Sequence, residues 1–344
     1  MINMKQNPDV SIIVPAYNEE MMISNCLNCL LNLDYPKNQY EVIVVNDGST
    51  DQTKNIVETY NKKYSNLILL NKNNGGKASA QNFGLKYAKG KYILITDSDA
   101  IVEKKWISKM IKDLEINDVV VGSCYSMENK SLLEKIQNSY YLIKFKFGGL
   151  KGRPSIGVNN GFHKEIIKYI GEFDESRVSV TEDFIKRAEN SNFKVHFDPE
   201  IIAFTKCTNN IHGFFKQKLR WREKLRWREI FLNYLRGEKG AYIDLLGLVY
   251  SVGLSSILFI SFMLSLFKLN FYYFLFSFIF VYAILFMVYF SSFIRLCQSN
   301  DKAYAKYFIG YLFLEIAVRM ILIPYNLYRL INPRKRPTFQ SNRG

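Results

Sequence analysis

The sequence predicts an α/β protein with a doubly wound, mostly parallel β-sheet, followed by an amphipathic helix and a membrane region of α-helices. Three observations support this prediction. In the N-terminal part, short apolar runs alternate with helix-like segments, which is the pattern of buried parallel strands. A basic and aromatic segment follows near residue 220. Beyond about residue 240, two long apolar stretches are broken mainly by Lys268 and Asn270.

Four apolar runs are the candidate strands, and they span residues 10–15, 40–45, 67–70 and 92–96. Polar segments follow three of them: PAYNE at 15–19, NDGSTD at 46–51 and DSD at 97–99. Doubly wound sheets bind their ligands at the carboxyl ends of the strands. We therefore expect the functional site at that edge of the sheet.

Asp97 and Asp99 flank a single residue directly after the fourth run. Two carboxylates at that spacing can bind a divalent cation that also takes diphosphate oxygens, and such hard ligands suit Mg²⁺ or Mn²⁺. Taken alone, the triplet is equally typical of a turn, because Asp often caps helices. The same alternative applies to Asp47. The GGK segment at 75–77 predicts either a phosphate-binding helix start or a plain turn.

A second acidic segment, Thr181-Glu182-Asp183, predicts the first turn of a short helix. Thr181 suits the N-cap, and acidic residues in a first turn suit the helix dipole. The same turn can also hold a catalytic carboxylate, so the two interpretations are compatible. Asn160 and Gly161 precede another predicted helix, and a turn explains them equally well.

Together and in this order, these segments resemble the family 2 glycosyltransferases, which have the GT-A fold. The matching segments cover nearly all of residues 9–221 and are VSIIVPAYNEE, VVNDGSTD, GGKASAQNFGL, ITDSDA, VNNGFHKE, VTEDF and QKLRW. The resemblance implies an inverting enzyme that transfers a sugar from a nucleoside diphosphate donor. It also implies a UDP-sugar as the expected donor and Mn²⁺ or Mg²⁺ as the cofactor.

The resemblance implies roles for individual residues. The residues expected to bind the donor are Ala16, Tyr17, Glu19, Asp47, Lys77, Asp97, Gln217 and Arg220. The metal ligands are Asp99 and Asp97. Asp183 is the general base, with Glu182 beside it in the catalytic motif, and the acceptor contacts are Trp221, Asn160 and Gly161. Such a single displacement needs one carboxylate to take the acceptor proton and an electrophile to stabilise the leaving diphosphate.

The stretch QKLRWREKLRW at 217–227 contains the tetrad KLRW twice. Family members that polymerise sugars, such as cellulose, chitin and hyaluronan synthases, carry Gln-x-x-Arg-Trp. Gln217, Arg220 and Trp221 satisfy this motif and share one face of a helix, whereas the second copy has Glu223 in place of the glutamine. Trp227 lies six positions after Trp221, a rotation of about 240°. We therefore expect the first copy to bind diphosphate and acceptor, and Trp227 to anchor the helix at a membrane surface.

Two apolar stretches, 241–267 and 271–294, are each long enough to cross a bilayer. A third segment, 307–328, has the length but carries Glu315 and Arg319, which at i, i+4 spacing can neutralise each other inside a bundle. Whether this third segment spans the membrane or is re-entrant stays open.

Topology follows from the basic loops. The N-terminus has no apolar signal-peptide core, so we expect the first part of the chain to stay in the cytoplasm. Two spans would return the chain to the cytoplasm at the basic loop after residue 294, in accordance with the positive-inside rule. We thus predict a multi-pass protein of the cell membrane. Its parts are a cytoplasmic GT-A domain at 1–210, an interface helix at 211–238, membrane segments at 239–332 and a basic tail at 333–344.

A formal net charge of +15 favours anionic partners such as a phosphorylated substrate or acidic lipids. The leading prediction is sugar transfer to a growing polysaccharide, and the alternative is addition of one sugar to a lipid-linked acceptor. A non-enzymatic membrane scaffold or a nucleic-acid binder would leave Asp47, Asp99 and Asp183 unexplained, so we expect no nucleic-acid partner. A homo-oligomer stays open.

The chain has five cysteines, an odd number, scattered along the sequence. Since Cys26 and Cys29 have no second pair to complete a tetrahedral site, we expect buried thiols in a reducing compartment and no metal bound by cysteine.

Overall fold

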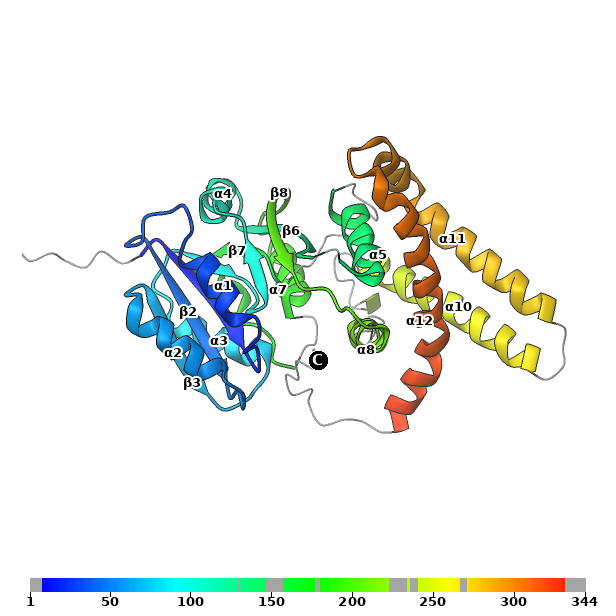
Figure 1. The fold of residues 1–344 in the computed structure, drawn as a ribbon, viewed down its shortest axis with the longest axis horizontal. Coiled ribbons are helices and arrows are strands. Elements are labelled where there is room, and N and C mark those ends of the chain that lie inside the picture. The colour runs from blue at the N-terminus through cyan, green and yellow to red at the C-terminus, as the bar shows by residue number, and fades with distance from the viewer. Residues whose placement is uncertain are drawn as a thin grey trace, which may run out of the picture. The chain divides into compact units, whose positions relative to one another are not determined.

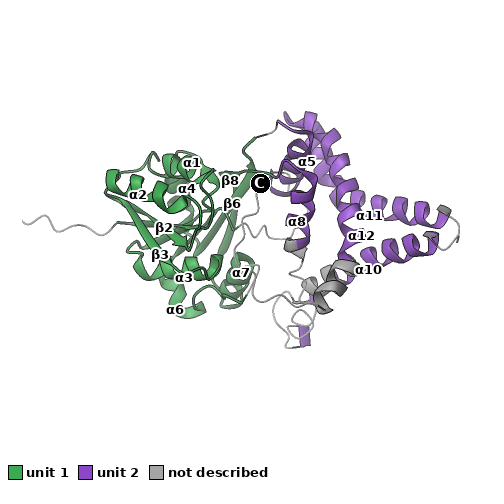
Figure 2. Ribbon diagram, turned by 60° about the horizontal axis from the view of Figure 1, so that its bottom comes forward, with its two compact units in different colours: residues 1–128, 152–207, 336–344 green, residues 129–151, 208–335 purple. Residues whose placement is uncertain are grey.

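The structure is a computed structural model that describes residues 8–128, 130–146, 157–176, 180–222, 234–235, 241–266 and 271–331 (Figure 1). The chain divides into two compact units (Figure 2). The sheet unit comprises Met1–Glu128, Gly152–Cys207 and Arg336–Gly344, and the helical unit comprises Asn129–Lys151 and Thr208–Lys335. The helical unit thus takes one segment from the middle of the sequence, which the predicted division near residue 210 does not include.

The sheet unit contains one mixed β-sheet. Its described strands are β1 (Val10–Ala16), β2 (Tyr40–Asp47), β3 (Leu67–Lys72), β4 (Tyr92–Ile95), β5 (Ala100–Val102), β6 (Val119–Ser126), β7 (Asn160–His163) and β8 (Val195–Thr205). They are ordered β3-β2-β1-β4-β7-β6-β8-β5. The first four strands are parallel, as predicted, and β7 runs antiparallel to both β4 and β6. The four parallel strands therefore end at a common edge.

Helices cover both faces of this sheet. They are α1 (Ile23–Leu30), α2 (Thr53–Lys63), α3 (Lys77–Tyr87), α4 (Trp106–Leu114), a short 3-10 turn η2 (Lys164–Ile166), α6 (Ile167–Ile170) and α7 (Val180–Asn190). Helices α1, α2 and α4 share one hydrophobic core with the strands, and α3, α6 and α7 lie on the opposite face (Figure 2). Gly84 allows α3 to pack closely, since a Cβ there would lie 2.8 Å from Ile13 Cγ2. The doubly wound architecture is confirmed.

Asn159, just before β7, connects α4, β6 and β8 inside the core of the sheet unit. Its Oδ1 accepts a hydrogen bond from Trp106 Nε1 at 2.7 Å. Its Nδ2 donates to the carbonyl oxygens of Ser123 at 2.8 Å and Ile201 at 2.9 Å. The side chain is fully buried, so water cannot replace these partners.

We expect Asn159→Ala to lower the free energy of unfolding by about 3 kcal/mol, because it leaves buried polar groups without partners. Chemical denaturation of the purified protein measures the change. The matched control is Asn117→Ala, because Asn117 Nδ2 bonds the carbonyl of Asp113 in the preceding turn at a partly exposed position. Equal stability changes for the two variants would contradict this role of Asn159.

The helical unit contains the remaining described helices. They are α5 (Leu132–Tyr141), which continues as a π-helical turn η1 (Leu142–Lys146), then α8 (Ile211–Arg222), α10 (Ala241–Leu266), α11 (Phe271–Gln298), a 3-10 turn η3 (Lys302–Tyr304) and α12 (Ala305–Ile331). Ser131 and Glu134 form a capping box that fixes the start of α5. The predicted interface helix at 211–238 is described only as α8, and most of its second half lies outside the described residues.

Among the described residues, one helical stretch is long and apolar enough to cross a bilayer. It is Tyr272–Gln298 in α11, with a mean hydropathy of 2.3 and 17% of the apolar window buried. This low burial distinguishes it from the core helix of a soluble protein. The described part of α10 yields a shorter apolar stretch, Gly253–Ser265. The structure thus weakly supports one membrane segment, and it does not support the predicted multi-span, multi-pass region.

Charged side chains in α8 and α12 are buried inside the helical unit. Glu315 and Arg319 pair at 3.3 Å and each is 7% exposed, so the neutralisation expected from their spacing is confirmed. The ammonium of Lys218 in α8 lies 4.8 Å from the ring centre of Tyr140 and 5.3 Å from that of Tyr311. These cation–π contacts join α8 to α5 and α12.

The cysteines are free thiols; Cys26, Cys124 and Cys207 are buried as predicted, whereas Cys29 is only partly buried. The prediction of a buried thiol is wrong for Cys297, which is exposed near the end of α11, where many side chains of that helix face outward.

Candidate functional site

The carboxyl ends of β1 and β2 and the start of α3 form a shallow hollow. It is lined by Pro15, Ala16, Tyr17, Asp47, Lys77 and Ala80. The structure therefore brings together four of the residues predicted to bind the donor. Glu19 lies in the turn after β1, where its backbone amide donates to Thr53 Oγ1 at 2.8 Å, and it does not line this hollow.

Asp47 organises the loop that leads into α3. Its buried carboxylate accepts from the amides of Gly75 at 3.0 Å and Gly76 at 2.8 Å, and from Lys72 Nζ at 2.7 Å. Gly48, with φ +73°, lets this loop approach, because a Cβ there would lie 2.8 Å from the backbone nitrogen of residue 74. Asp47 thus fixes the position of the α3 N-terminus beside the hollow.

Lys77, the first residue of α3, links three parts of the site. Its Nζ contacts Asp97 Oδ1 and donates to the carbonyl of Gly157 at 3.2 Å. The side chains of Lys77 and Asp97 are 21% and 26% exposed, so a ligand in the hollow could compete for this ammonium. A Cβ on Gly157 would lie 3.0 Å from Lys77 Nζ and 3.3 Å from Thr181 Oγ1, which places the start of α7 beside the ion pair.

The backbone of the DSD segment is supported from below by α1. Cys26 Sγ donates to the carbonyl of Asp97 at 3.5 Å, and Cys29 Sγ donates to that of Val102 at 3.0 Å. Burial raises the pKa of the Cys26 thiol well above its ordinary value, with smaller contributions from Cys29 and Asp97. The thiol therefore stays protonated and keeps its role as a donor.

Asp99 lies between β4 and β5 and is 4% exposed, with Thr205 Oγ1 at 3.5 Å from its Oδ2. In the described part of the chain, no group of three or more His, Cys, Asp or Glu residues could hold a metal ion. Asp97 and Asp99 offer two carboxylates. Mg²⁺-type sites commonly use one or two carboxylates together with substrate phosphates. The pair therefore offers too few protein ligands for a preformed cage, and it suits a cation only if a bound ligand supplies further oxygens.

Asp183 and Glu182 both lie in the first turn of α7, but their surroundings differ. Asp183 Oδ2 accepts from Arg187 Nε at 2.8 Å, and the Asp183 side chain is 16% exposed. Glu182 is 42% exposed and pairs with Lys186 at 3.4 Å. The structure thus orients the Asp183 carboxylate more firmly than that of Glu182.

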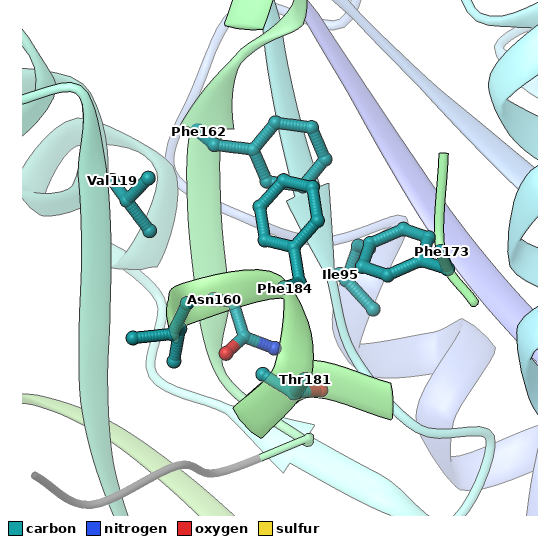
Figure 3. Close-up of a pocket in the computed structure, with 8 residues that line it drawn as sticks. Ile95, Val119, Asn160, Phe162, Phe173, Thr181 and Phe184 are labelled. Carbon is teal, nitrogen blue, oxygen red and sulfur yellow. The ribbon is translucent and has the colours of Figure 1, made fainter. Parts of the chain in front are cut away.

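Asn160 and Gly161 lie in β7 rather than in the expected turn. Asn160 borders a small cavity of about 10 Å³ lined by Ile95, Val119, Asn160, Phe162, Phe173, Thr181, Phe184 and Ile185 (Figure 3). Its Oδ1 is buried and has no hydrogen-bond partner in the described structure. Gly161 allows the Leu94 side chain to pack against β7, since a Cβ at residue 161 would lie 2.7 Å from Leu94 Cδ2. Their predicted contact with the acceptor stays a prediction.

The Gln-x-x-Arg-Trp residues belong to α8 in the helical unit. Gln217 is partly buried, and its Oε1 has no partner among the described residues. Arg220 and Trp221 lie within α8, but their side chains are outside the description. The second tetrad, with Trp227, also lies outside the described residues.

Sequence reasoning missed several residues of this site. Lys72 neutralises Asp47, Gly157 supports Lys77, and Arg187 binds Asp183. The i, i+4 spacing of Asp183 and Arg187 was a readable signal. The contacts of Lys72 and Gly157 depend on pairings between distant segments, which have no local signature.

Comparisons with known proteins agree with this fold. The model described as "Glycosyl transferase family 2" matches residues 11–171, and the one described as "Glycosyl transferase family group 2" matches residues 92–291, more than half of the chain. The chain is 30% identical over 235 residues to the probable glycosyltransferase YdaM of Bacillus subtilis, covering 64% of this chain and 56% of that protein. It is 28% identical over 232 residues to the poly-beta-1,6-N-acetyl-D-glucosamine synthase of Staphylococcus epidermidis, covering 64% and 55%.

The chain thus spans about half the length of these two relatives. Among solved structures, the mannosyltransferase PcManGT from Pyrobaculum calidifontis, in complex with GDP-Man and Mn²⁺, has a TM-score of 0.58 and 19% identity. The match covers 92% of this chain and 87% of that one. At this identity the likeness concerns the fold alone, and it agrees with the predicted GT-A fold.

Proposed function

Because the chain belongs to glycosyl transferase family group 2, whose model matches residues 92–291, we propose that it transfers a sugar from a nucleoside diphosphate donor to a glycan acceptor with inversion. The observation that carries this proposal is the cluster of Asp47, Lys77, Asp97 and Thr181 around one end of the sheet. It combines a shallow hollow, an ammonium and the start of the helix that bears Asp183.

The donor diphosphate is proposed to bind at the α3 N-terminus. Helix N-termini attract phosphate, and the ammonium of Lys77 adds a full positive charge there. Asp97 and Asp99 would hold Mn²⁺ or Mg²⁺ with the phosphates. That cation supplies neutralisation of the charge on the leaving diphosphate. Lys77 pairs with Asp97, and donor binding would exchange this partner for a phosphate oxygen.

Asp183 is proposed to take the proton of the acceptor hydroxyl as that oxygen attacks the anomeric carbon. The bond from this carbon to the diphosphate breaks in the same displacement, so the configuration inverts and the chain needs no covalent intermediate. Asp183 lies in the first turn of α7, and Thr181 of the same turn lies close to Gly157, which binds Lys77; this placement supports the assignment.

A polysaccharide is the proposed acceptor. The Gln217–Trp221 motif and the similarity to a poly-N-acetylglucosamine synthase support polymerisation. A single addition to a lipid-linked acceptor is the second candidate. The outward apolar side chains of α11 favour it, among them Phe276, Ile279 and Met287, because such a helix suits a lipid environment. In either case we propose a cell-membrane location with the sheet unit in the cytoplasm.

One experiment tests both candidates. The full chain, purified in detergent, is incubated with labelled UDP- and GDP-sugars and Mn²⁺ or Mg²⁺, and the product is sized. A ladder or a polymer supports polymerisation, and a single labelled lipid from added polyprenyl phosphate supports the second candidate. No transfer from any donor, with a protein shown to be folded, would reject the proposed function.

The tandem tetrads make a separate prediction. We expect Trp221→Ala to lower transfer by about 10²-fold, because a misplaced acceptor costs about that much. Trp227→Ala should instead reduce binding to vesicles with acidic lipids and leave transfer in detergent within about threefold. Activity assays and vesicle flotation measure the two effects. Equal loss of transfer in both variants, with both folded, would contradict the division of roles.

A further inference from the structure

Arg187 connects the proposed base to the backbone of the sheet unit. Its Nε donates to Asp183 Oδ2 at 2.8 Å. Its Nη2 donates to the carbonyl of Glu172 at 2.9 Å, and its Nη1 contacts the carbonyls of Gly171, at 3.4 Å, and Ile170. One guanidinium therefore binds three consecutive carbonyl oxygens together with the carboxylate.

The three carbonyls fix the guanidinium independently of Asp183. They lie at the C-terminal end of α6, where helix carbonyls favour a cation. Gly171, with φ +77°, ends this helix and turns the chain. A planar guanidinium has several N–H donors in fixed directions and can bind the three carbonyl oxygens and the carboxylate at once. A lysine ammonium cannot reproduce this arrangement of donors. The backbone carbonyls thus fix the position of the Arg187 guanidinium, and the guanidinium in turn fixes the position of the Asp183 carboxylate.

The neighbouring pair on the same helix provides a contrast. Glu182 and Lys186 have the same i, i+4 spacing, but their side chains are 42% and 45% exposed. The side chains of Asp183 and Arg187 are 16% and 29% exposed, and their contact is shorter. Exposed pairs contribute little to geometry or stability. Only the second pair has the burial expected of a group that holds a reacting atom.

We propose that Arg187 is a positioning residue that holds the Asp183 carboxylate at the start of α7, aimed at the acceptor hydroxyl. This inference rests on the proposed function, in which Asp183 takes the acceptor proton. Arg187 itself transfers no proton and touches no substrate. Without it, the Asp183 side chain can rotate among its rotamers, and the fraction of time spent in the reactive geometry falls.

The test compares Arg187→Ala, Arg187→Lys and the matched control Lys186→Ala in the full chain. We expect Arg187→Ala to lower kcat by about 10²-fold with the donor KM changed by less than about twofold, since a misplaced catalytic group affects the chemical step. Arg187→Lys should recover a small part of the loss. Added ethylguanidinium should raise the kcat of Arg187→Ala at least about fivefold, because it restores a guanidinium that can donate to the Asp183 carboxylate. Lys186→Ala should stay within about twofold of the wild type and show no rescue.

Thermal unfolding separates positioning from a folding defect, and Arg187→Lys, which keeps the charge, provides a second variant if Arg187→Ala unfolds. Asp183→Asn is measured beside them. If Asp183→Asn retains full transfer, the assigned base is wrong and the role of Arg187 falls with it. If Asp183→Asn is inactive while the folded Arg187 variants keep wild-type kcat, or lose donor affinity instead, the inference alone is overturned.

Discussion

Replacing Asp183 with Asn is expected to lower the rate of sugar transfer by about 10³-fold, because a positioned general base contributes about 10²- to 10⁴-fold. The amide has nearly the shape of the carboxylate but cannot accept the proton of the acceptor hydroxyl. Donor binding should stay within about threefold of the wild type, since the hollow is lined by residues of other elements. Initial rates with labelled donor and equilibrium binding of the nucleotide measure the two effects.

Glu189→Gln is the matched control for Asp183→Asn, because it neutralises a carboxylate later in the same helix, α7. It should transfer sugar within about twofold of the wild type. A tenfold loss in donor affinity for Asp183→Asn, with kcat unchanged, would assign this carboxylate to donor binding instead. Full activity of the variant would remove it from the site.

The part of the fold that sequence could predict is the part with local signatures. The first four strands are apolar runs with β-branched residues, buried throughout in β1, β2 and β4 and partly buried in the edge strand β3, so the pattern predicts their positions and their common edge. Glu315 and Arg319 were likewise paired by their spacing alone. In both cases neighbours in sequence determine the structure.

The remaining features depend on pairings between distant segments. The antiparallel β7, inserted between β4 and β6, converts Asn160 from an expected turn residue into a strand residue facing a cavity. Asp47 appeared available to the nucleotide, yet its carboxylate also holds Gly75 and Gly76 of the next loop. Helix α5 joins helices that follow it by more than a hundred residues. Local periodicity contains none of this information.

Replacing Asp99 with Asn is expected to lower transfer by about 10²-fold and to raise the concentration of Mn²⁺ needed for half-maximal activity. Asp99 is 4% exposed, and its charge is proposed to be balanced by the cation that neutralises the diphosphate. Asp97→Asn should lose less, because it releases the ammonium of Lys77, which can then bind the diphosphate directly. Removal of the cation by EDTA should abolish transfer, and added Mn²⁺ or Mg²⁺ should restore it.

The Asp99 and Asp97 variants are expected to differ in the Mn²⁺ concentration that they need, and this difference tests the cation site. If the carboxylates only cap the turn into β5, both variants should lose stability and neither should change the response to Mn²⁺. If the cation is held as proposed, the Asp99 variant should need more Mn²⁺ than the Asp97 variant at equal thermal stability. Asp118→Asn, at the opposite end of the sheet beside the amide of Lys194, controls for loss of a carboxylate elsewhere. Transfer that is unaffected by EDTA would leave Lys77 as the electrophile at the leaving diphosphate and contradict the cation site.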